Sequence, residues 1–371
     1  MHIERSIKSQ VLASLSHGKV LLLYGARQVG KTTLVKEVLK TIPFGRYLSC
    51  DEPDVRDAFT RQSSTAMKAF IGTASLVVLD EAQRVPDIGI TLKLLHDTYP
   101  DLRIIATGPS SFDLANSIVE PLTGRNIPFT LFPISYGEFA STVGEIEARR
   151  LLEHRVIHGM YPSVIASPAP DQEVKRLCND YLFKDVLRLD TVRKPLVVEQ
   201  LARLLAMQVG SEVSVNELAQ KLEISRPTIL SYIRLLEQAF VIFRLPPLGR
   251  NRRNEITRLE KIYFYDTGMR NALLDDFKLL SLRQDAGALF ENFFIVERMK
   301  WRQLVGTDAR HYFWRTKEGS EIDYVEERGN ELQAFECKLG GGNINTRAWH
   351  NAFPEVPVTQ ITMETLKQSL K

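Results

Sequence analysis

The chain has 371 residues, which is more than one ordinary hydrophobic core accommodates, so we expect two or three domains. Its 44% hydrophobic and 25% charged residues are typical of a soluble globular protein. It has no apolar run near the roughly 20 residues of a membrane span and no apolar signal segment, and its three cysteines are scattered. We therefore expect a cytoplasmic protein without membrane contact, a disulfide framework or a structural zinc site. The net charge of +3 permits nucleic-acid binding without requiring it.

A short apolar run at residues 19–24 predicts a buried parallel strand, and a glycine-rich motif follows it directly. The motif matches the P-loop pattern GxxxxGK(S/T) in full, and its candidate nucleotide-binding residues are Gly25, Ala26, Arg27, Gln28, Val29, Gly30, Lys31, Thr32 and Thr33. Glycines let successive backbone N–H groups point into one anion-binding hollow, to which the helix N-terminus adds partial positive charge. We expect Lys31 to reach the β- and γ-phosphates of ATP and the Thr32 hydroxyl to bind Mg²⁺. The flanking strand argues against a chance glycine turn.

Two carboxylates end the next apolar run, residues 76–79. Asp80 and Glu81 follow that run directly, and open α/β sheets bind ligands at the carboxyl ends of their strands. We expect Asp80 to hold Mg²⁺, directly or through water, and Glu81 to orient and deprotonate the attacking water. The alternative is a surface Asp-Glu pair, which the position about fifty residues beyond a P-loop disfavours.

Several segments together resemble a prokaryotic family of AAA+ ATPases whose C-terminal region is uncharacterised. They are GARQVGKTT, LVVLDEAQRVPD, IIATGPSS and LTGRNIPFTLFPISYGEF, and GMYPSVI and KIYFYDTG extend the resemblance over nearly the whole chain. The resemblance implies a sheet of five parallel strands, to which residues 47–50 contribute one. Two positions depart from the family pattern, because Pro109 replaces an expected serine and Met160 an expected glycine. Pro109 lies two residues after Thr107, so this departure affects the nucleotide contact expected of Thr107 more than the P-loop assignment.

The same resemblance implies roles for two further residues. Thr107 follows the strand predicted at residues 102–106, where a polar residue of AAA+ ATPases touches the γ-phosphate or the attacking water. Arg125 is the candidate to stabilise the transferring phosphoryl group, in cis or from a neighbouring subunit. A solvated or structural arginine is an equally open interpretation of Arg125. Because AAA+ ATPases often form rings, we expect a homo-oligomer, with a monomer as the alternative.

The middle of the chain carries a helical segment and then the pattern of a winged helix. Residues 137–205 fit the helical lid of AAA+ proteins by analogy only. Ser214 opens a capping box and Pro227 lies in the first turn of a second helix, which strands at 239–245 and 261–265 follow. The loop between these strands is basic, and we expect it to contact DNA phosphates through Arg250, Arg252, Arg253 and Arg258. The alternative is a winged helix that packs subunits together.

The C-terminal segment predicts an amphipathic helix and then a meander of three strands, at residues 311–315, 321–325 and 332–339. Because alternate side chains of a strand share a face, Glu336 and Lys338 point the same way. The alternative for this pair is a cross-strand ion pair on a solvated face. Its apolar flanks, however, suggest a largely buried strand, where unpaired charges are costly.

Asp323 lies on the strand next to Glu336, so the two carboxylates can bind a divalent ion between them. Lys338 beside that ion would position or activate a water against a phosphodiester, and Glu291 on the preceding helix would complete the metal site. This Asp followed by E-x-K resembles the PD-(D/E)XK nuclease family. The motif is short and occurs by chance in many sequences, so retained cleavage is a separate question from the fold.

The segments combine into an α/β protein of four domains. We expect an AAA+ P-loop ATPase core with a parallel five-stranded sheet over residues 1–136, a helical lid or linker over 137–205, a winged helix over 206–275, and an α/β restriction-endonuclease-like domain over 276–371. The predicted function is Mg²⁺-dependent ATP hydrolysis coupled to DNA engagement, with or without phosphodiester cleavage by the C-terminal domain. The alternative is an ATP-dependent regulatory or assembly switch whose nuclease-like domain is catalytically inactive.

Overall fold

The computed structural model describes residues 1–108, 121–181, 194–249, 259–307 and 309–370. These residues form two compact units. The N-terminal unit comprises Glu4–Pro133 with Gln238–Phe240, and the C-terminal unit comprises Met1–Ile3, Ile134–Glu237 and Val241–Lys371. No helix in the described ranges is both long and apolar enough to cross a membrane.

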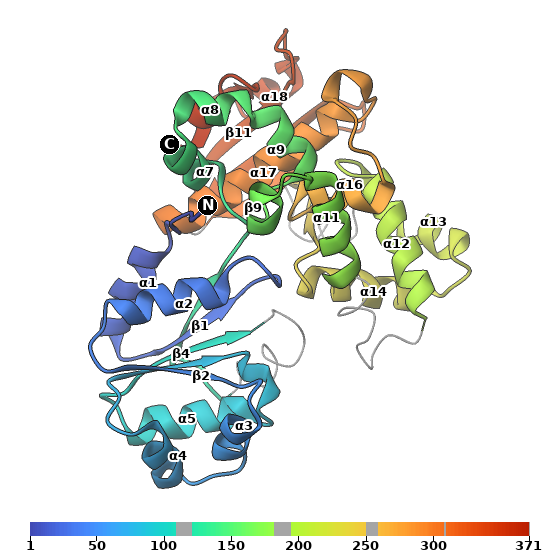
Figure 1. Ribbon diagram of the computed structural model, residues 1–371. Helices are drawn as coiled ribbons and strands as arrows, with labels where there is room; N and C mark the ends of the chain where they lie inside the picture. The colour runs from blue at the N-terminus through green and yellow to red at the C-terminus, as the bar shows by residue number, and fades with distance from the viewer. Residues whose placement is uncertain (109–120, 182–193, 250–258, 308, 371) are drawn as a thin grey trace. The chain divides into compact units, whose positions relative to one another are not determined.

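A five-stranded parallel sheet forms the centre of the N-terminal unit (Figure 1). Its strands are β1 (Val20–Tyr24), β2 (Gly45–Ser49), β3 (Leu76–Asp80), β4 (Arg103–Gly108) and β5 (Asn126–Thr130), in the order β2-β3-β4-β1-β5. All neighbouring strands run parallel, so their carboxyl ends meet at one edge. The predicted sheet of five parallel strands is therefore confirmed.

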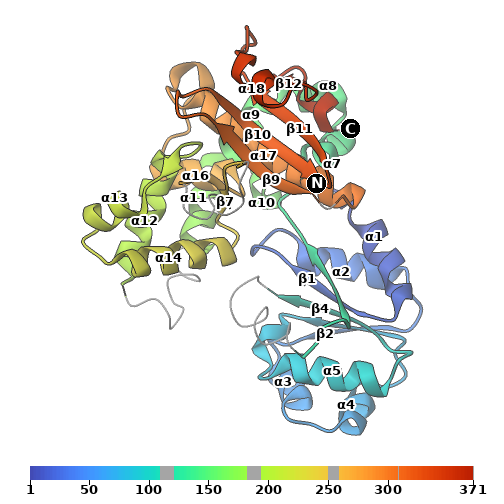
Figure 2. The same ribbon diagram turned by 180° about the vertical axis from the view of Figure 1, so that it is seen from behind.

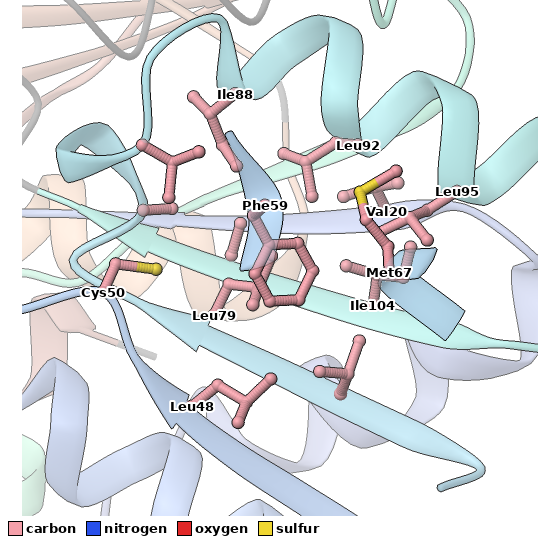
Figure 3. Packing of buried hydrophobic residues seen from close by; sticks show 14 of the residues in the cluster. Val20, Leu48, Cys50, Phe59, Met67, Leu79, Ile88, Leu92, Leu95 and Ile104 are labelled. Carbon is pink, nitrogen blue, oxygen red and sulfur yellow. The ribbon is translucent and has the colours of Figure 1, made fainter. Parts of the chain in front are cut away.

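Helices cover both faces of this sheet (Figure 1). They are α1 (Lys8–Ser14), η1 (Leu15–His17), α2 (Lys31–Lys40), α3 (Pro53–Phe59), α4 (Ser64–Ile71), η2 (Ala82–Arg84) and α5 (Ile88–Thr98). The face towards α3, α4 and α5 carries a buried cluster in which Leu48, Leu79 and Ile104 of the strands meet Phe59 and Leu92 of the helices (Figure 3). Because both faces are covered, β1, β3 and β4 carry buried apolar residues on both sides, at residues 20–23, 76–79 and 104–106.

The C-terminal unit begins with a helical segment. Its helices are α7 (Tyr136–Val143), α8 (Glu145–Arg150), α9 (Leu152–His158), α10 (Pro162–Ala166), α11 (Pro170–Cys178) and α12 (Pro195–Met207). Helix α7 starts with a capping box, in which the Ser135 hydroxyl accepts the Glu138 N–H at 3.1 Å and the Glu138 carboxylate accepts the Ser135 N–H at 2.8 Å. The two reciprocal bonds satisfy two of the N–H groups that a helix start leaves without partners.

Two short helices and a small antiparallel sheet follow. They are α13 (Val215–Lys221), α14 (Arg226–Gln238), and the strands β6 (Glu212–Val213), β8 (Glu260–Phe264) and β7 (Ile242–Leu245), which pair in the order β6-β8-β7. The Ser214 hydroxyl accepts the Glu217 N–H at 3.4 Å at the start of α13. Helix α16 (Thr267–Leu274) and η4 (Leu280–Leu282) complete this part.

The last part of the chain packs one long helix, α17 (Ala286–Val305), along a four-stranded sheet (Figure 2). The strands are β9 (Arg310–Arg315), β10 (Glu321–Arg328), β11 (Glu331–Cys337) and β12 (Val358–Ile361), in the order β12-β11-β10-β9. The first three pair antiparallel and β12 joins β11 in parallel after α18 (Arg347–Ala352), and η5 (Leu366–Leu370) ends the fold. The sequence prediction lacked β12.

Candidate functional site

The predicted nucleotide-binding residues lie at the carboxyl edge of the parallel sheet. The P-loop joins the end of β1 to the start of α2, and Asp80 and Thr107 lie at the ends of β3 and β4. Leu23 and Thr107 are paired across β1 and β4, which places the start of the P-loop beside the end of β4. The topology thus gathers at one edge residues that lie up to about eighty positions apart in the sequence.

The P-loop backbone has a conformation that depends on its glycines. Gly25 and Gly30 have φ of 150° and 99°, and Gln28 has φ of 61°. A Cβ atom at Gly25 would collide with the carbonyl oxygen of Leu131, whose N–H donates to Tyr24 at 2.7 Å. The loop therefore passes so close to the chain after β5 that only glycine fits at position 25.

Lys31 lies buried at the start of α2. Its ammonium group donates to the carbonyl oxygens of Gly25 at 2.8 Å and Ala26 at 2.9 Å. Burial lowers the pKa of Lys31 to about 8, and the nearby carboxylates of Glu81 and Asp80 partly offset this effect. A lysine with this pKa is still about nine-tenths charged at pH 7, so it offers a desolvated positive charge at the loop where phosphates would bind.

Three hydroxyl groups donate to the carboxylate of Asp80. The Thr32 hydroxyl reaches Oδ2 at 2.7 Å and the Tyr47 hydroxyl reaches the same oxygen at 2.6 Å. The fully buried Thr107 hydroxyl donates to Oδ1. Asp80 is itself only 2% exposed, so these bonds compensate for the loss of water around a buried charge.

Glu81 leaves β3 in a left-handed backbone conformation, with φ of 54° and ψ of 43°. Its N–H donates to the Thr107 hydroxyl at 3.2 Å, so Thr107 holds both the Asp80 side chain and the Glu81 backbone. Its carboxylate accepts the side-chain amide of Gln83 at 2.6 Å. A positive φ at a residue other than glycine is uncommon, and such conformations often occur at functional sites.

Arg125 does not lie with the other predicted catalytic residues of the N-terminal unit. It precedes β5, and its carbonyl accepts the Val20 N–H at 2.9 Å, which places it at the amino ends of the strands. Its guanidinium pairs with Asp97 at 2.8 Å. The structure therefore contradicts a role for Arg125 in cis, because the P-loop lies at the carboxyl ends. A role in a neighbouring subunit stays a prediction.

Three residues of this site were missed by sequence reasoning. Tyr47 and Gln83 contact the two carboxylates, and Arg5 donates to the carbonyls of Val29 at 2.7 Å and Phe132 at 2.7 Å. Arg5 thereby joins the P-loop to the chain that follows β5. The sequence offered a signal for Tyr47 alone, because it lies on a predicted strand. The register of that strand against the strand of Asp80 would have placed the two residues close together.

The side chains present fit a magnesium nucleotide. Mg²⁺ prefers oxygen ligands, usually one or two from the protein together with phosphate oxygens and water. The Thr32 hydroxyl and the Asp80 carboxylate lie 2.7 Å apart at the loop that carries the buried Lys31. No group of three or more His, Cys, Asp and Glu side chains suited to a metal ion occurs among the described residues. A site that relies on phosphate oxygens does not need such a group.

The second predicted site lies at the junction of α17 and the C-terminal sheet. Asp323 and Glu336 are neighbours on β10 and β11, since the Asp323 N–H donates to Glu336 at 3.4 Å. Asp323 accepts the Cys337 N–H at 2.8 Å, and Lys338 pairs with Glu336 at 2.9 Å. Burial raises the pKa of Asp323 well above its ordinary value, and Glu291 and Glu336 add to this effect. The structure thus brings the four predicted residues into one electrostatic cluster.

A lysine that the sequence did not suggest lies in the same cluster. Lys261 of β8 is 2% exposed and pairs with Glu291 at 3.4 Å and with Glu321. The Tyr263 hydroxyl also donates to Glu291. Burial opposes the charged form of Lys261, but Glu291 and Glu321 outweigh it and raise its pKa. Glu291 therefore has an ammonium group and a phenol as partners in this structure.

The four arginines predicted to contact DNA, Arg250, Arg252, Arg253 and Arg258, lie outside the described chain. Arg226, Leu230 and Arg234 of α14 are exposed, while Ile229 and Ile233 are buried. Residues 226, 230 and 234 are one turn apart, so they form a single outward stripe on the helix.

Comparisons with known proteins divide the chain into three parts. Residues 17–140 match the family model of an AAA domain, and residues 149–280 and 286–352 match two domains of unknown function, DUF8612 and DUF4143. An uncharacterised protein of Mycobacterium tuberculosis is 29% identical over 367 residues, covering 97% of this chain and 79% of its own. An uncharacterised protein of Methanocaldococcus jannaschii is 23% identical over 346 residues, covering 86% and 74%.

Among solved structures, a Walker-type ATPase of Pyrococcus abyssi is similar to the chain, with a TM-score of 0.49 and 16% identity over 74% of this chain and 96% of that one. The family match agrees with the parallel sheet, the P-loop and the Asp80 network described above. Residues 17–140 are therefore a P-loop domain that matches the family model of an AAA domain.

Proposed function

We propose that the chain binds ATP with Mg²⁺ at its P-loop, hydrolyses the ATP, and couples hydrolysis to the engagement of a nucleic acid, with DNA as the first candidate. The observation that carries the ATPase half is the convergence of hydroxyls from α2, β2 and β4 on the buried Asp80. Lys31 and Glu81 lie next to this carboxylate and supply the two charges that hydrolysis needs.

The residues have distinct parts in this proposal. The P-loop N–H groups and Lys31 hold the phosphates, and Thr32 and Asp80 hold Mg²⁺. Bound Mg²⁺ would neutralise charge on the β- and γ-phosphates. Glu81 accepts the proton of the attacking water, while the Gln83 amide at 2.6 Å fixes the orientation of its carboxylate.

The test of this half compares ATP binding and turnover in three variants. Lys31→Ala should weaken ATP binding at least about tenfold, because it removes the main charge on the phosphates. Glu81→Gln should retain binding and lower turnover by about 10²- to 10⁴-fold. Lys40→Ala, at the exposed end of the same helix, is the control and should behave like the wild type. Normal turnover in Glu81→Gln would show that the catalytic base is another residue.

The nucleic-acid half is supported by the exposed arginines of α14, which lie on one stripe of the second of two short helices. Replacing Arg226 and Arg234 by Ala should weaken DNA binding and flatten its dependence on salt by about two units of slope. Arg149 and Arg150 of α8 are also exposed and provide the matched double replacement as a control. Equal salt slopes in the two double variants would contradict DNA contact through α14.

One observation favours the second candidate function, an ATP-dependent switch whose C-terminal domain cuts nothing. Lys261 lies among Glu291, Glu321 and Asp323, where its ammonium group competes with a divalent cation for the same carboxylates. An ion-pair network of this kind serves to hold β8, α17 and β10 together. The nuclease interpretation instead requires Asp323, Glu336 and Lys338 to act on a phosphodiester.

The two interpretations predict different results for the same proteins. If the domain is a nuclease, the wild type cleaves DNA with Mg²⁺ or Mn²⁺, with or without ATP, and Asp323→Ala does not. If it is a switch, neither protein cleaves single-stranded, duplex or supercoiled DNA. In that case Lys261→Met lowers the free energy of unfolding by about 3 kcal/mol, because it leaves buried carboxylates without their partner.

A further inference from the structure

The phenol of Tyr47 is a contact of the nucleotide site to which no role has been assigned. Strand β2 lies next to β3 with Ser49 paired to Asp80, so Tyr47 lies two residues before the row of that carboxylate. Leu48 packs into the cluster facing α3, α4 and α5, and side chains alternate along a strand. Tyr47 therefore faces the α2 side, and its hydroxyl reaches Asp80 Oδ2 at 2.6 Å.

A lysine of α2 also contacts the Tyr47 ring. The ammonium group of Lys36 lies 4.7 Å from the ring centroid, in the range of a cation–π contact. Lys36 follows Thr32 by four residues, so both face the same side of α2. One face of α2 thus makes two contributions. Its Thr32 hydroxyl donates to Asp80 Oδ2, and its Lys36 ammonium group contacts the Tyr47 ring, whose own hydroxyl donates to the same oxygen.

Three hydroxyl groups together orient the carboxylate of Asp80. A carboxylate oxygen has two lone-pair directions. Thr32 and Tyr47 both donate to Oδ2 of Asp80, and Thr107 donates to Oδ1. Rotation of the Asp80 carboxylate would break the Tyr47 bond. We propose that Tyr47 is a positioning residue that fixes the Asp80 carboxylate for Mg²⁺ and thereby sets the metal dependence of nucleotide binding.

This inference rests on the proposed ATP site and deepens it. Residues that hydrogen-bond a metal ligand from outside typically change metal affinity or activity by about 10- to 100-fold when they are removed. Tyr47→Phe deletes only the hydroxyl and keeps the ring over which Lys36 lies. Tyr99→Phe is the matched control, because Tyr99 belongs to the same unit and packs partly buried against the apolar cluster.

The experiment titrates Mg²⁺ into each purified full-length protein with a fluorescent, non-hydrolysable ATP analogue and follows binding. A parallel series records the thermal midpoint with the analogue, with and without Mg²⁺. In Tyr47→Phe the Mg²⁺ concentration for half-saturation should rise about tenfold, while binding of the analogue without metal stays as in the wild type. Tyr99→Phe should match the wild type in both series.

Each other outcome has a definite meaning. A Mg²⁺ response in Tyr47→Phe equal to that of the wild type would overturn the positioning role while leaving the ATP site intact. Wild-type protein whose binding of the analogue does not respond to Mg²⁺ would overturn the proposed magnesium site and this inference with it. Lys36→Met removes the contact on the ring but not the hydroxyl, so a shift as large as that of Tyr47→Phe would attribute the effect to ring packing and contradict the inference.

Discussion

Thr107 shows how one side chain can serve two neighbours at the site. Its hydroxyl donates to the Asp80 carboxylate and accepts the Glu81 N–H at 3.2 Å, and it is fully buried. The resemblance to AAA+ ATPases implies contact with the γ-phosphate or the attacking water, which stays a prediction. In the structure this hydroxyl joins the Asp80 carboxylate, which we propose as a Mg²⁺ ligand, to Glu81, which we propose as the base.

Thr107→Val should therefore impair both stability and turnover. It leaves a buried N–H without its acceptor and costs about 1–3 kcal/mol of unfolding free energy. It should also lower kcat about tenfold or more, because Glu81 loses its backbone anchor. Thr91→Val is the control, since Thr91 is a buried threonine of the same unit that donates to the Phe59 carbonyl at 3.3 Å. Chemical denaturation and ATPase assays on both variants check this, and equal kcat values would contradict the coupling.

At the scale of elements, two segments that share the family resemblance meet inside the C-terminal unit. Asp266 precedes α16, and its carboxylate accepts the Met160 N–H at 2.7 Å and the Met269 N–H at 3.1 Å. A Cβ at Gly159 would collide with that carboxylate, and one at Gly268 with the His158 carbonyl. Met160, where a glycine was expected, is buried and supplies its backbone N–H, so a side chain is accommodated there.

Gly268→Ala should destabilise the C-terminal unit by about 2 kcal/mol or more, because the added methyl group requires the α9–α10 turn to move away from α16. Gly287→Ala, in the first turn of α17 with open space around the position, should change stability by less than about 1 kcal/mol, in the stabilising direction. Urea unfolding of the two variants compares them directly. A Gly268→Ala protein as stable as the wild type would show that this junction adapts.

Whole-molecule stability should depend on two partly buried histidines of the C-terminal unit. Burial lowers the pKa of His154 to about 4, assisted by His158 and Arg155 and opposed by Asp171. Burial and Arg302 lower that of His311 to about 4. Because the unfolded chain has the ordinary histidine pKa near 6.5, it binds more protons than the folded chain between about pH 4 and 6.5. Stability is thus complete above about pH 6.5 and decreases as the pH falls through this window.

The expected loss is on the order of 1 kcal/mol per histidine, after allowance for solvent screening. Thermal midpoints measured from pH 7 to pH 4 should fall, and a His154→Gln, His311→Gln protein should show a flatter profile. Replacing the exposed His17 is the control and should leave the profile unchanged. Identical slopes in wild type and double variant would rule out these two residues as the source.

Assembly is the second property of the whole molecule, and Arg125 provides its test. If Arg125 acts on a neighbouring subunit, Arg125→Ala and Lys31→Ala proteins should each be inactive alone. A mixture should regain part of the activity, because the first supplies an intact P-loop and the second an intact arginine. A mixture that stays inactive, although sedimentation shows mixed oligomers, would contradict action in trans.

The sequence predicted well those strands and motifs whose signal lies within a few consecutive residues. β1, β3 and β4 are covered on both faces, so each contains a short apolar run, and the P-loop is a contiguous motif. β12 was missed because only four residues form it and its pairing with β11 is long-range. Lys261 was missed because its partners Glu291 and Glu321 lie on other elements. A charge within an apolar strand does not indicate which distant groups will neutralise it.

The strand order also has a consequence for how the chain is made. β1 lies between β4 and β5, and Leu21 pairs with Ile105 and with Ile127. During translation β1 leaves the ribosome first, yet its neighbours are synthesised roughly a hundred residues later, which at about 5–20 residues per second takes several seconds. For that interval the nascent P-loop strand has an apolar sequence and no partner strands. Chaperone engagement of the growing polypeptide should therefore be strongest before β5 emerges and should fall once it has joined the sheet.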